Sequence, residues 1–190
     1  MTKPIVSVAL LMLLEEGRLR LDTPASEFLP KFADLEVYAG MDEKTGEMQT
    51  EACKYPVTIH QLLTHTSGLT YEMHAEHHPV AKLYKQSFAE RSPLSLEGMV
   101  NHLLNFPLAY QPGTRWHYSV STDVCARLVE IISGQSIDRF LQQRIFDPLG
   151  MEDTGYHVPP QELSRLAELY CIADWFDPNL TPEILEKAWQ

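Results

Sequence analysis

The most hydrophobic stretch of the chain lies at its start, where every residue from Ile5 to Leu14 is apolar except Ser7. Such a run predicts a buried helix without a polar face, about 15 Å long. This is too short to cross a bilayer, which takes about 20 apolar residues. Pro4 suits the first turn of the helix, and Lys3 then stands at the mouth of an apolar element.

Lys3 has three interpretations. In the first, the segment is a core helix whose lysine reaches out to water. In the second, the basic start and short apolar run are a secretory signal; against this, the run passes directly into Glu15-Glu16-Gly17 without a small-x-small cleavage site. In the third, Lys3 is catalytic, and its nucleophile would lie one helical turn earlier, just before Met1. The hydrophobic pattern alone leaves all three open.

The rest of the pattern predicts mainly helices. Apolar residues at helical spacing, bounded by capping residues, indicate helices over 59–63, 95–105, 121–133 and 137–146, and a short one beginning at Pro24. The expected N-caps are Thr58, Ser121 and Ser136. A further capped helix is expected from Thr181 to Trp189, with no role that we can assign.

One β-hairpin interrupts these helices. Residues 35–38 alternate as a strand does, and the chain becomes extended again over 48–50 after the polar turn 42–47. The fold class is therefore mainly α-helical with a small hairpin near 35–50.

Composition narrows the function. A chain of 190 residues is enough for one domain, and 44% hydrophobic with 22% charged residues is typical of globular proteins. The net charge of −11 argues against nucleic acid and anionic membranes as partners. The three cysteines form no CxxC pair, which favours reduced thiols in a cytoplasmic protein; they are Cys53, Cys125 and Cys171.

Two polar segments carry candidate chemistry. Five potential ligands crowd together at Glu72, His74, Glu76, His77 and His78, but no HExxH spacing completes a metal set. A polar loop is favoured there over a metal site or a substrate-facing rim. Tyr118 lies just before the helix expected at 121, where its phenol is either a structural hydroxyl or a reactive group.

Four landmarks together resemble one family. They are Met1-Thr2-Lys3-Pro4 with the apolar helix, the block Leu62-Leu63-Thr64-His65-Thr66-Ser67-Gly68-Leu69, the turn Gln111-Pro112-Gly113 leading to Tyr118-Ser119, and Pro148-Leu149-Gly150-Met151 followed by Asp153-Thr154. In this order and spacing the chain resembles the serine β-lactamase and penicillin-binding superfamily, in its class C β-lactamase-related, esterase-like branch.

The resemblance implies an α+β parent fold and a serine acyl hydrolase: an esterase, a β-lactamase or a D-alanyl carboxypeptidase. A serine three residues before Lys3 would attack an ester or amide, and Lys3 and Tyr118 would share its proton. Partly desolvated beside another donor, Lys3 would lose its proton more easily and act as the base. Ser119 and Val120 would border the substrate. Val120 stands where β-lactamases often have asparagine, which favours small esters. No metal and no cofactor are implied.

The chain also departs from the family pattern. The serine position falls before Met1, and the third motif, expected late on an internal strand, is absent; we interpret Lys44-Thr45-Gly46 as a solvated hairpin tip. We therefore expect 1–190 to be one partial domain with most of the central sheet missing. By itself it would be inactive, or a non-catalytic pseudo-enzyme or binding scaffold. Its uncovered apolar helix would favour self-association.

Overall fold

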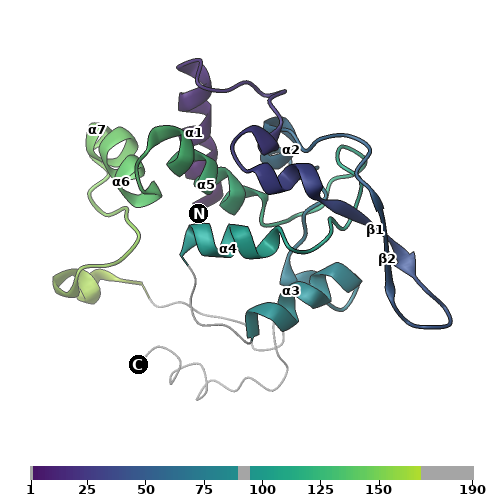
Figure 1. Ribbon diagram of the computed structural model, residues 1–190. Helices are drawn as coiled ribbons and strands as arrows, with labels where there is room; N and C mark the ends of the chain where they lie inside the picture. Colours follow the sequence, from purple (N-terminus) through teal and green to yellow (C-terminus); the bar gives the residue numbers. More distant parts are fainter. Residues whose placement is uncertain (1, 90–94, 168–190) are drawn as a thin grey trace. The chain divides into compact units, whose positions relative to one another are not determined.

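The computed structural model describes residues 2–89 and 95–167 of the chain (Figure 1). Two compact units are distinguished, Met1–Thr154 and Gly155–Gln190. The first holds the helices α1 (Thr2–Glu15), α2 (Ile59–Leu63), α3 (Pro79–Ala89), α4 (Leu96–Leu103), α5 (Ser121–Ser133), α6 (Ile137–Leu141) and α7 (Asp147–Leu149), with the strands β1 (Glu36–Met41) and β2 (Met48–Ala52). In the second, a 3₁₀ turn covers Pro160–Arg165. The expected helix from Thr181 to Trp189 lies outside the described residues.

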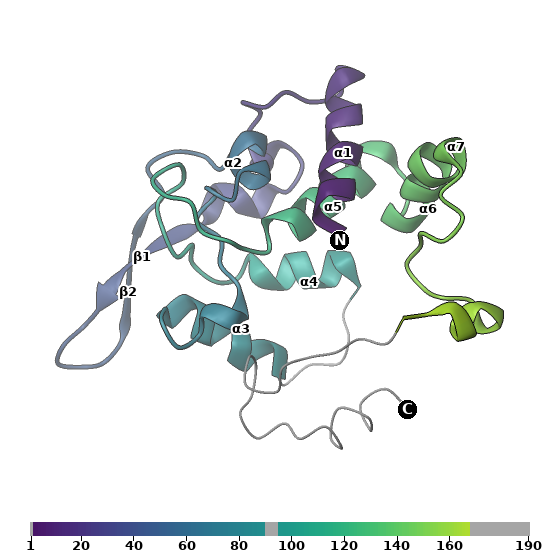
Figure 2. The same ribbon diagram turned by 180° about the vertical axis from the view of Figure 1, so that it is seen from behind.

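The expectation of a mainly helical chain with one hairpin is confirmed. β1 and β2 pair antiparallel, with Glu36 opposite Ala52 and Met41 opposite Met48. The hairpin extends away from the helices (Figure 2). Asp42 closes its turn by accepting hydrogen bonds from the backbone N–H groups of Lys44 and Thr45. Lys44-Thr45-Gly46 is therefore an exposed hairpin tip, as interpreted from the sequence.

The opening helix α1 packs beside α5, and the two lie together in both views (Figure 1, Figure 2). One face of α1 is buried, through Val6, Ala9, Leu10 and Leu13. The expectation that α1 has no water-facing side is wrong for this chain, because Val8 is 48% and Leu11 40% exposed. Within the residues described here, no helix has the length and apolar content needed to span a membrane.

Capping follows the sequence at α2 but not at α5. Thr58 and Gln61 form a reciprocal capping box at the start of α2. At α5 the N-cap position is Val120, not Ser121. The Ser121 hydroxyl forms hydrogen bonds with the hydroxyls of Ser67 and Ser119 and does not cap the helix. The helix α3 was not predicted, since the histidines before it and its several polar residues mask the spacing of its buried Val80 and Tyr84.

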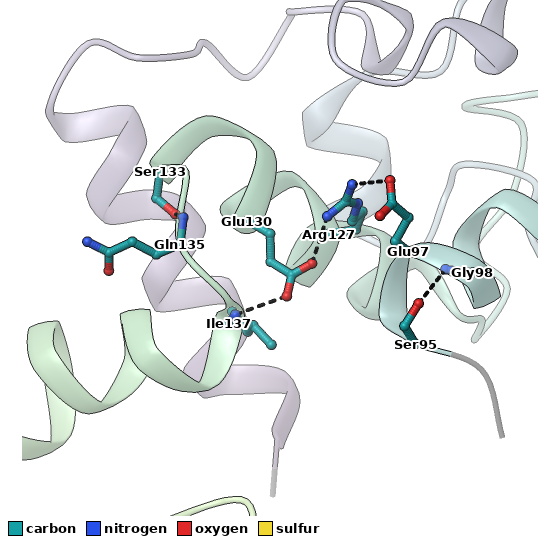
Figure 3. Close-up of polar contacts among 8 residues, drawn as sticks. All are labelled: Ser95, Glu97, Gly98, Arg127, Glu130, Ser133, Gln135 and Ile137. Carbon is teal, nitrogen blue, oxygen red and sulfur yellow. Dashed lines mark hydrogen bonds and ion pairs between the residues drawn. The ribbon is translucent and has the colours of Figure 1, made fainter.

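An ion-pair network joins α4, α5 and α6 (Figure 3). Arg127 of α5 binds Glu97 of α4 at 2.6 Å and Glu130 of its own helix at 3.0 Å. The second carboxylate oxygen of Glu130 accepts a hydrogen bond from the backbone N–H of Ile137, at the start of α6. The Glu130 carboxylate thus forms an ion pair with Arg127 and also accepts a hydrogen bond from a free N–H group at the start of α6.

Replacing Glu130 with glutamine is expected to lower the free energy of unfolding by about 2 kcal/mol, because it leaves the largely buried Arg127 without its more buried charge partner. The matched variant is Glu97→Gln, whose side chain is 58% exposed and which should cost about 0.5 kcal/mol. Urea unfolding with an unchanged m-value measures both. Equal losses in the two variants would contradict this account of the network.

Candidate active site

Lys3 and Tyr118 are far apart in the sequence, but their side chains are in contact in the structure. Lys3 lies in the first turn of α1, and its Nζ is 4.9 Å from the centroid of the Tyr118 ring. A third residue, Tyr71, completes the group: Lys3 Nζ donates a hydrogen bond to its hydroxyl at 3.3 Å. The rings of Tyr71 and Tyr118 stack, with centroids 5.6 Å apart. One ammonium is therefore shared by two stacked phenols.

Tyr71 connects this group to the start of α5. Its hydroxyl donates to Oδ2 of Asp123 at 3.3 Å. Asp123 lies in the first turn of α5, where free backbone N–H groups favour a negative charge. The site thus contains a cation and an anion joined through a neutral phenol.

The pKa of Lys3 follows from these contacts. Burial alone lowers the pKa of Lys3, but hydrogen bonding to Tyr118 and Tyr71 outweighs burial, and the pKa lies above its ordinary value. Lys3 is therefore an ammonium ion at neutral pH. This is opposite to the sequence-based expectation that desolvation would make Lys3 a more easily deprotonated base.

The segment Thr64–Thr70, which is rich in small and hydroxyl residues, contacts the chain around Tyr118 on one side. His65 is the one non-glycine residue with positive φ (55°) in the described part of the chain. Its Nδ1 accepts from the backbone N–H of Ser119 at 3.3 Å, and its carbonyl oxygen accepts from the N–H of His117 at 2.8 Å. Because Nδ1 accepts, His65 is neutral, and burial lowers its pKa, aided by the charge of Lys3.

Ser119 and Val120 are both buried in the structure. The Ser119 hydroxyl lies in a chain of hydroxyls, 3.2 Å from His65 Nδ1 and 2.7 Å from the hydroxyl of Ser121, which also contacts Ser67 at 2.8 Å. The backbone N–H of Val120 donates to the carbonyl of Thr70. Their contact with substrate stays a prediction, and with buried side chains it would have to be made by the backbone.

Histidines support Tyr118 from the other side. His74 Nε2 donates to the backbone carbonyl of Tyr118 at 3.1 Å, and its ring lies 4.4 Å from that of His117. Burial, together with the charges of His74, His78 and Arg115, lowers the pKa of His117 to about 4. For the segment 72–78, which contains His74 and His78, the sequence favours a polar loop over a metal site or a substrate-facing rim. Over residues 2–89 and 95–167, no cluster of three His, Cys, Asp or Glu is arranged to hold a metal ion.

Sequence reasoning found Lys3 and Tyr118 but missed Tyr71 as part of the site. The available signal was its position, two residues after the Leu62–Leu69 block, at the end of a segment rich in small residues. Asp123 was not predicted as a site residue. Its partnership with Tyr71 joins residues 52 positions apart and cannot be seen in local patterning.

Comparison with known proteins identifies the family. Residues 1–183 match the sequence pattern of the Beta-lactamase family. The chain is similar to the lovastatin esterase of Penicillium rubens, at 33% identity over 88% of this chain and 41% of the esterase. It is similar to monacolin J acid methylbutanoyltransferase of Aspergillus terreus, at 30% identity over 88% of this chain and 40% of the transferase.

The fold agrees with these matches. The unliganded structure of simvastatin synthase from Aspergillus terreus superimposes with a TM-score of 0.75 and 26% identity, over 98% of this chain and 46% of that one. The chain thus spans less than half the length of these relatives. The resemblance inferred from the four landmarks is confirmed: the chain belongs to the beta-lactamase family, among its serine esterase and acyltransferase relatives.

Proposed function

We propose that the protein is a serine acyl hydrolase or acyltransferase that acts on small esters through an acyl-enzyme. The observation that carries the proposal is the contact of Lys3 Nζ with the Tyr118 ring at 4.9 Å, next to the start of α5. An ammonium and a phenol in contact are suited to moving a hydroxyl proton. Since the chain spans 41% of the matched esterase, the activity of the whole protein is a proposal.

In the proposed reaction, a serine one helical turn before Lys3 attacks the ester carbonyl. Tyr118 first releases its hydroxyl proton to solvent, and the Lys3 ammonium stabilises the resulting phenolate; the serine Oγ proton then passes to the Tyr118 oxygen. The tetrahedral intermediate then collapses, the ester C–O bond breaks, and the alcohol leaves with the proton from Tyr118. Water or a second alcohol repeats these steps in reverse on the acyl-enzyme. The raised pKa of Lys3 supports a role for the lysine as the stabilising cation.

The substrate class rests on two points. The relatives are named as an esterase of lovastatin and a methylbutanoyltransferase of monacolin J acid, which favours ester bonds as substrates. Val120 stands where the family's β-lactamases often carry asparagine, so no side-chain amide is offered to a β-lactam. Ser119 and Val120 are proposed to border the bound ester through their backbone. No metal or cofactor takes part in the proposed reaction.

The test is capture of the acyl-enzyme. A form of the protein extended before Met1 so that a serine stands three positions before Lys3 is mixed with p-nitrophenyl butyrate, and the intact mass is measured within seconds. We expect a burst of p-nitrophenol and a mass gain of one butyryl group. A polypeptide of residues 1–190 is the matched control, since it holds no residue three positions before Lys3. Absence of the adduct in the longer protein would refute the enzyme proposal and favour the non-catalytic scaffold.

A further inference from the structure

We infer that Tyr71 and Asp123 are a positioning pair, which holds the Lys3 ammonium over Tyr118 and leaves Tyr118 as the phenol that takes the serine proton. The inference rests on the proposed function. It starts from an ambiguity in the site: two phenols are stacked on each other, and Lys3 lies 5.3 Å from one ring centroid and 4.9 Å from the other. Either phenol would qualify by its distance from Lys3 alone.

Hydrogen bonding separates the two phenols. The Tyr71 oxygen accepts from Lys3 at 3.3 Å, and its hydrogen is directed to Asp123 Oδ2 at 3.3 Å. A phenol can donate to a carboxylate only while it keeps its own proton, so Tyr71 is held in the neutral form. In the part of the chain described, no carboxylate accepts a hydrogen bond from Tyr118, and its hydroxyl remains available for proton transfer.

Electrostatics adds to this difference. Burial raises the pKa of Tyr71, the charge of Asp123 raises it further, and the hydrogen bond from Lys3 offsets only part of the rise. His65, whose ring lies 5.0 Å from that of Tyr118, also faces the cluster, and its lowered pKa keeps it neutral. Among the described residues, the charged groups in contact with these phenols are the Lys3 ammonium and the Asp123 carboxylate, with Tyr71 between them.

The arrangement also restrains the lysine. A lysine side chain is long and flexible, and its position over Tyr118 requires a second fixed contact. Tyr71 supplies that contact, and Asp123 fixes the direction of the Tyr71 hydroxyl. The Tyr71 backbone is in turn placed by Thr70, whose carbonyl accepts from Val120 and whose hydroxyl contacts His117. The pair acts through Lys3 and Tyr118, without touching the reacting atoms.

The tests are Tyr71→Phe and Asp123→Asn in the full protein. Tyr71→Phe keeps the stacked ring but removes the hydrogen bond to Lys3. We expect kcat for p-nitrophenyl butyrate to fall about 30-fold with KM changed less than about 3-fold, since misplacement of a catalytic group affects the chemical step.

Asp123→Asn keeps an oxygen acceptor and removes the charge. Because a nearby anion opposes proton loss, its removal should move the acidic limb of the kcat–pH profile down by about half a pH unit.

A second readout does not depend on turnover. Lysines are reductively methylated with ¹³C-formaldehyde, and the Lys3 signal, assigned by its loss in Lys3→Arg, is titrated by NMR. Its pKa should fall in Tyr71→Phe, because the hydrogen bond that raises it is gone. The control is Tyr55→Phe, a tyrosine 68% exposed, which should change neither kcat nor the titration.

The outcomes separate the two proposals. An inactive wild-type protein whose Lys3 pKa still falls in Tyr71→Phe would refute the esterase proposal and support the positioning pair. An active wild type with an unchanged kcat, pH profile and Lys3 pKa in both variants would overturn the pair and leave the esterase standing. A loss of activity without a shift in the pH limb or in the Lys3 pKa would reduce both residues to a structural role, which also overturns the inference.

Discussion

Replacing Tyr118 with phenylalanine is expected to lower kcat for ester hydrolysis by about 10³-fold while leaving the protein folded, the size of effect usual for loss of a proton-transfer group. The substitution removes only the hydroxyl. The ring remains, and with it the stacking on Tyr71 and the contact of the Lys3 ammonium with the aromatic face. KM should stay within about 3-fold, because the removed interaction is used in the transition state and not for binding.

Lys3→Ala should cause a loss of similar size, because without its ammonium the Tyr118 phenolate is unstabilised. If the two residues act as one proton-transfer unit, the double variant will be no worse than the poorer single one. Lys82→Ala and Tyr55→Phe, both at exposed positions, are the matched controls and should keep full activity. Full activity in either test variant, or losses that multiply in the double variant, would contradict the shared role of Lys3 and Tyr118.

The elements that the sequence predicted correctly are those with strong local signals. α2 was found from its cap at Thr58, α5 from its apolar stripe, and the hairpin from its alternation and polar turn. α3 was missed because its buried face is short and its flanks are polar. The exposure of Val8 and Leu11 in α1 agrees with the expectation of an uncovered apolar helix, whereas the hydrophobic run by itself predicted full burial, because burial depends on which elements cover a helix.

Only the site residues that belong to the family's sequence motifs could be predicted from the sequence. Lys3 and Tyr118 were placed together by resemblance, and the structure brings them within contact distance. The pKa of Lys3 was expected to fall because of burial, and the second phenol, Tyr71, was not predicted beside it. Hydrogen bonds to Tyr118 and Tyr71, which only three-dimensional proximity creates, outweigh burial and raise the pKa of Lys3.

The backbone of the Leu62–Leu69 block requires a glycine at position 68. Gly68 has φ of +88°, and a Cβ added there would overlap the carbonyl oxygen of Tyr110. The same contact brings the N–H of Ala109 to the carbonyl of Gly68 at 2.7 Å. Close backbone approach at Gly68 thus joins the block to the segment that leads to Tyr118. Tyr71, three residues beyond, depends on this placement.

Gly68→Ala is therefore expected to lower the free energy of unfolding by about 4 kcal/mol or more, since it combines a left-handed backbone with an overlap against main-chain atoms that no side-chain rotation relieves. The matched variant is Gly17→Ala at the end of α1. Gly17 has φ of +71°, but nothing lies within 4 Å of its added Cβ, so only the conformational penalty of about 1 kcal/mol applies. The difference between the two, measured by urea unfolding, isolates the overlap. Where Gly68→Ala is too unstable to purify, thermal shift in cell lysate compares it with Gly17→Ala. Equal stability of the two variants would show that the Tyr110 carbonyl moves aside freely, and that the block does not hold Tyr71 in place.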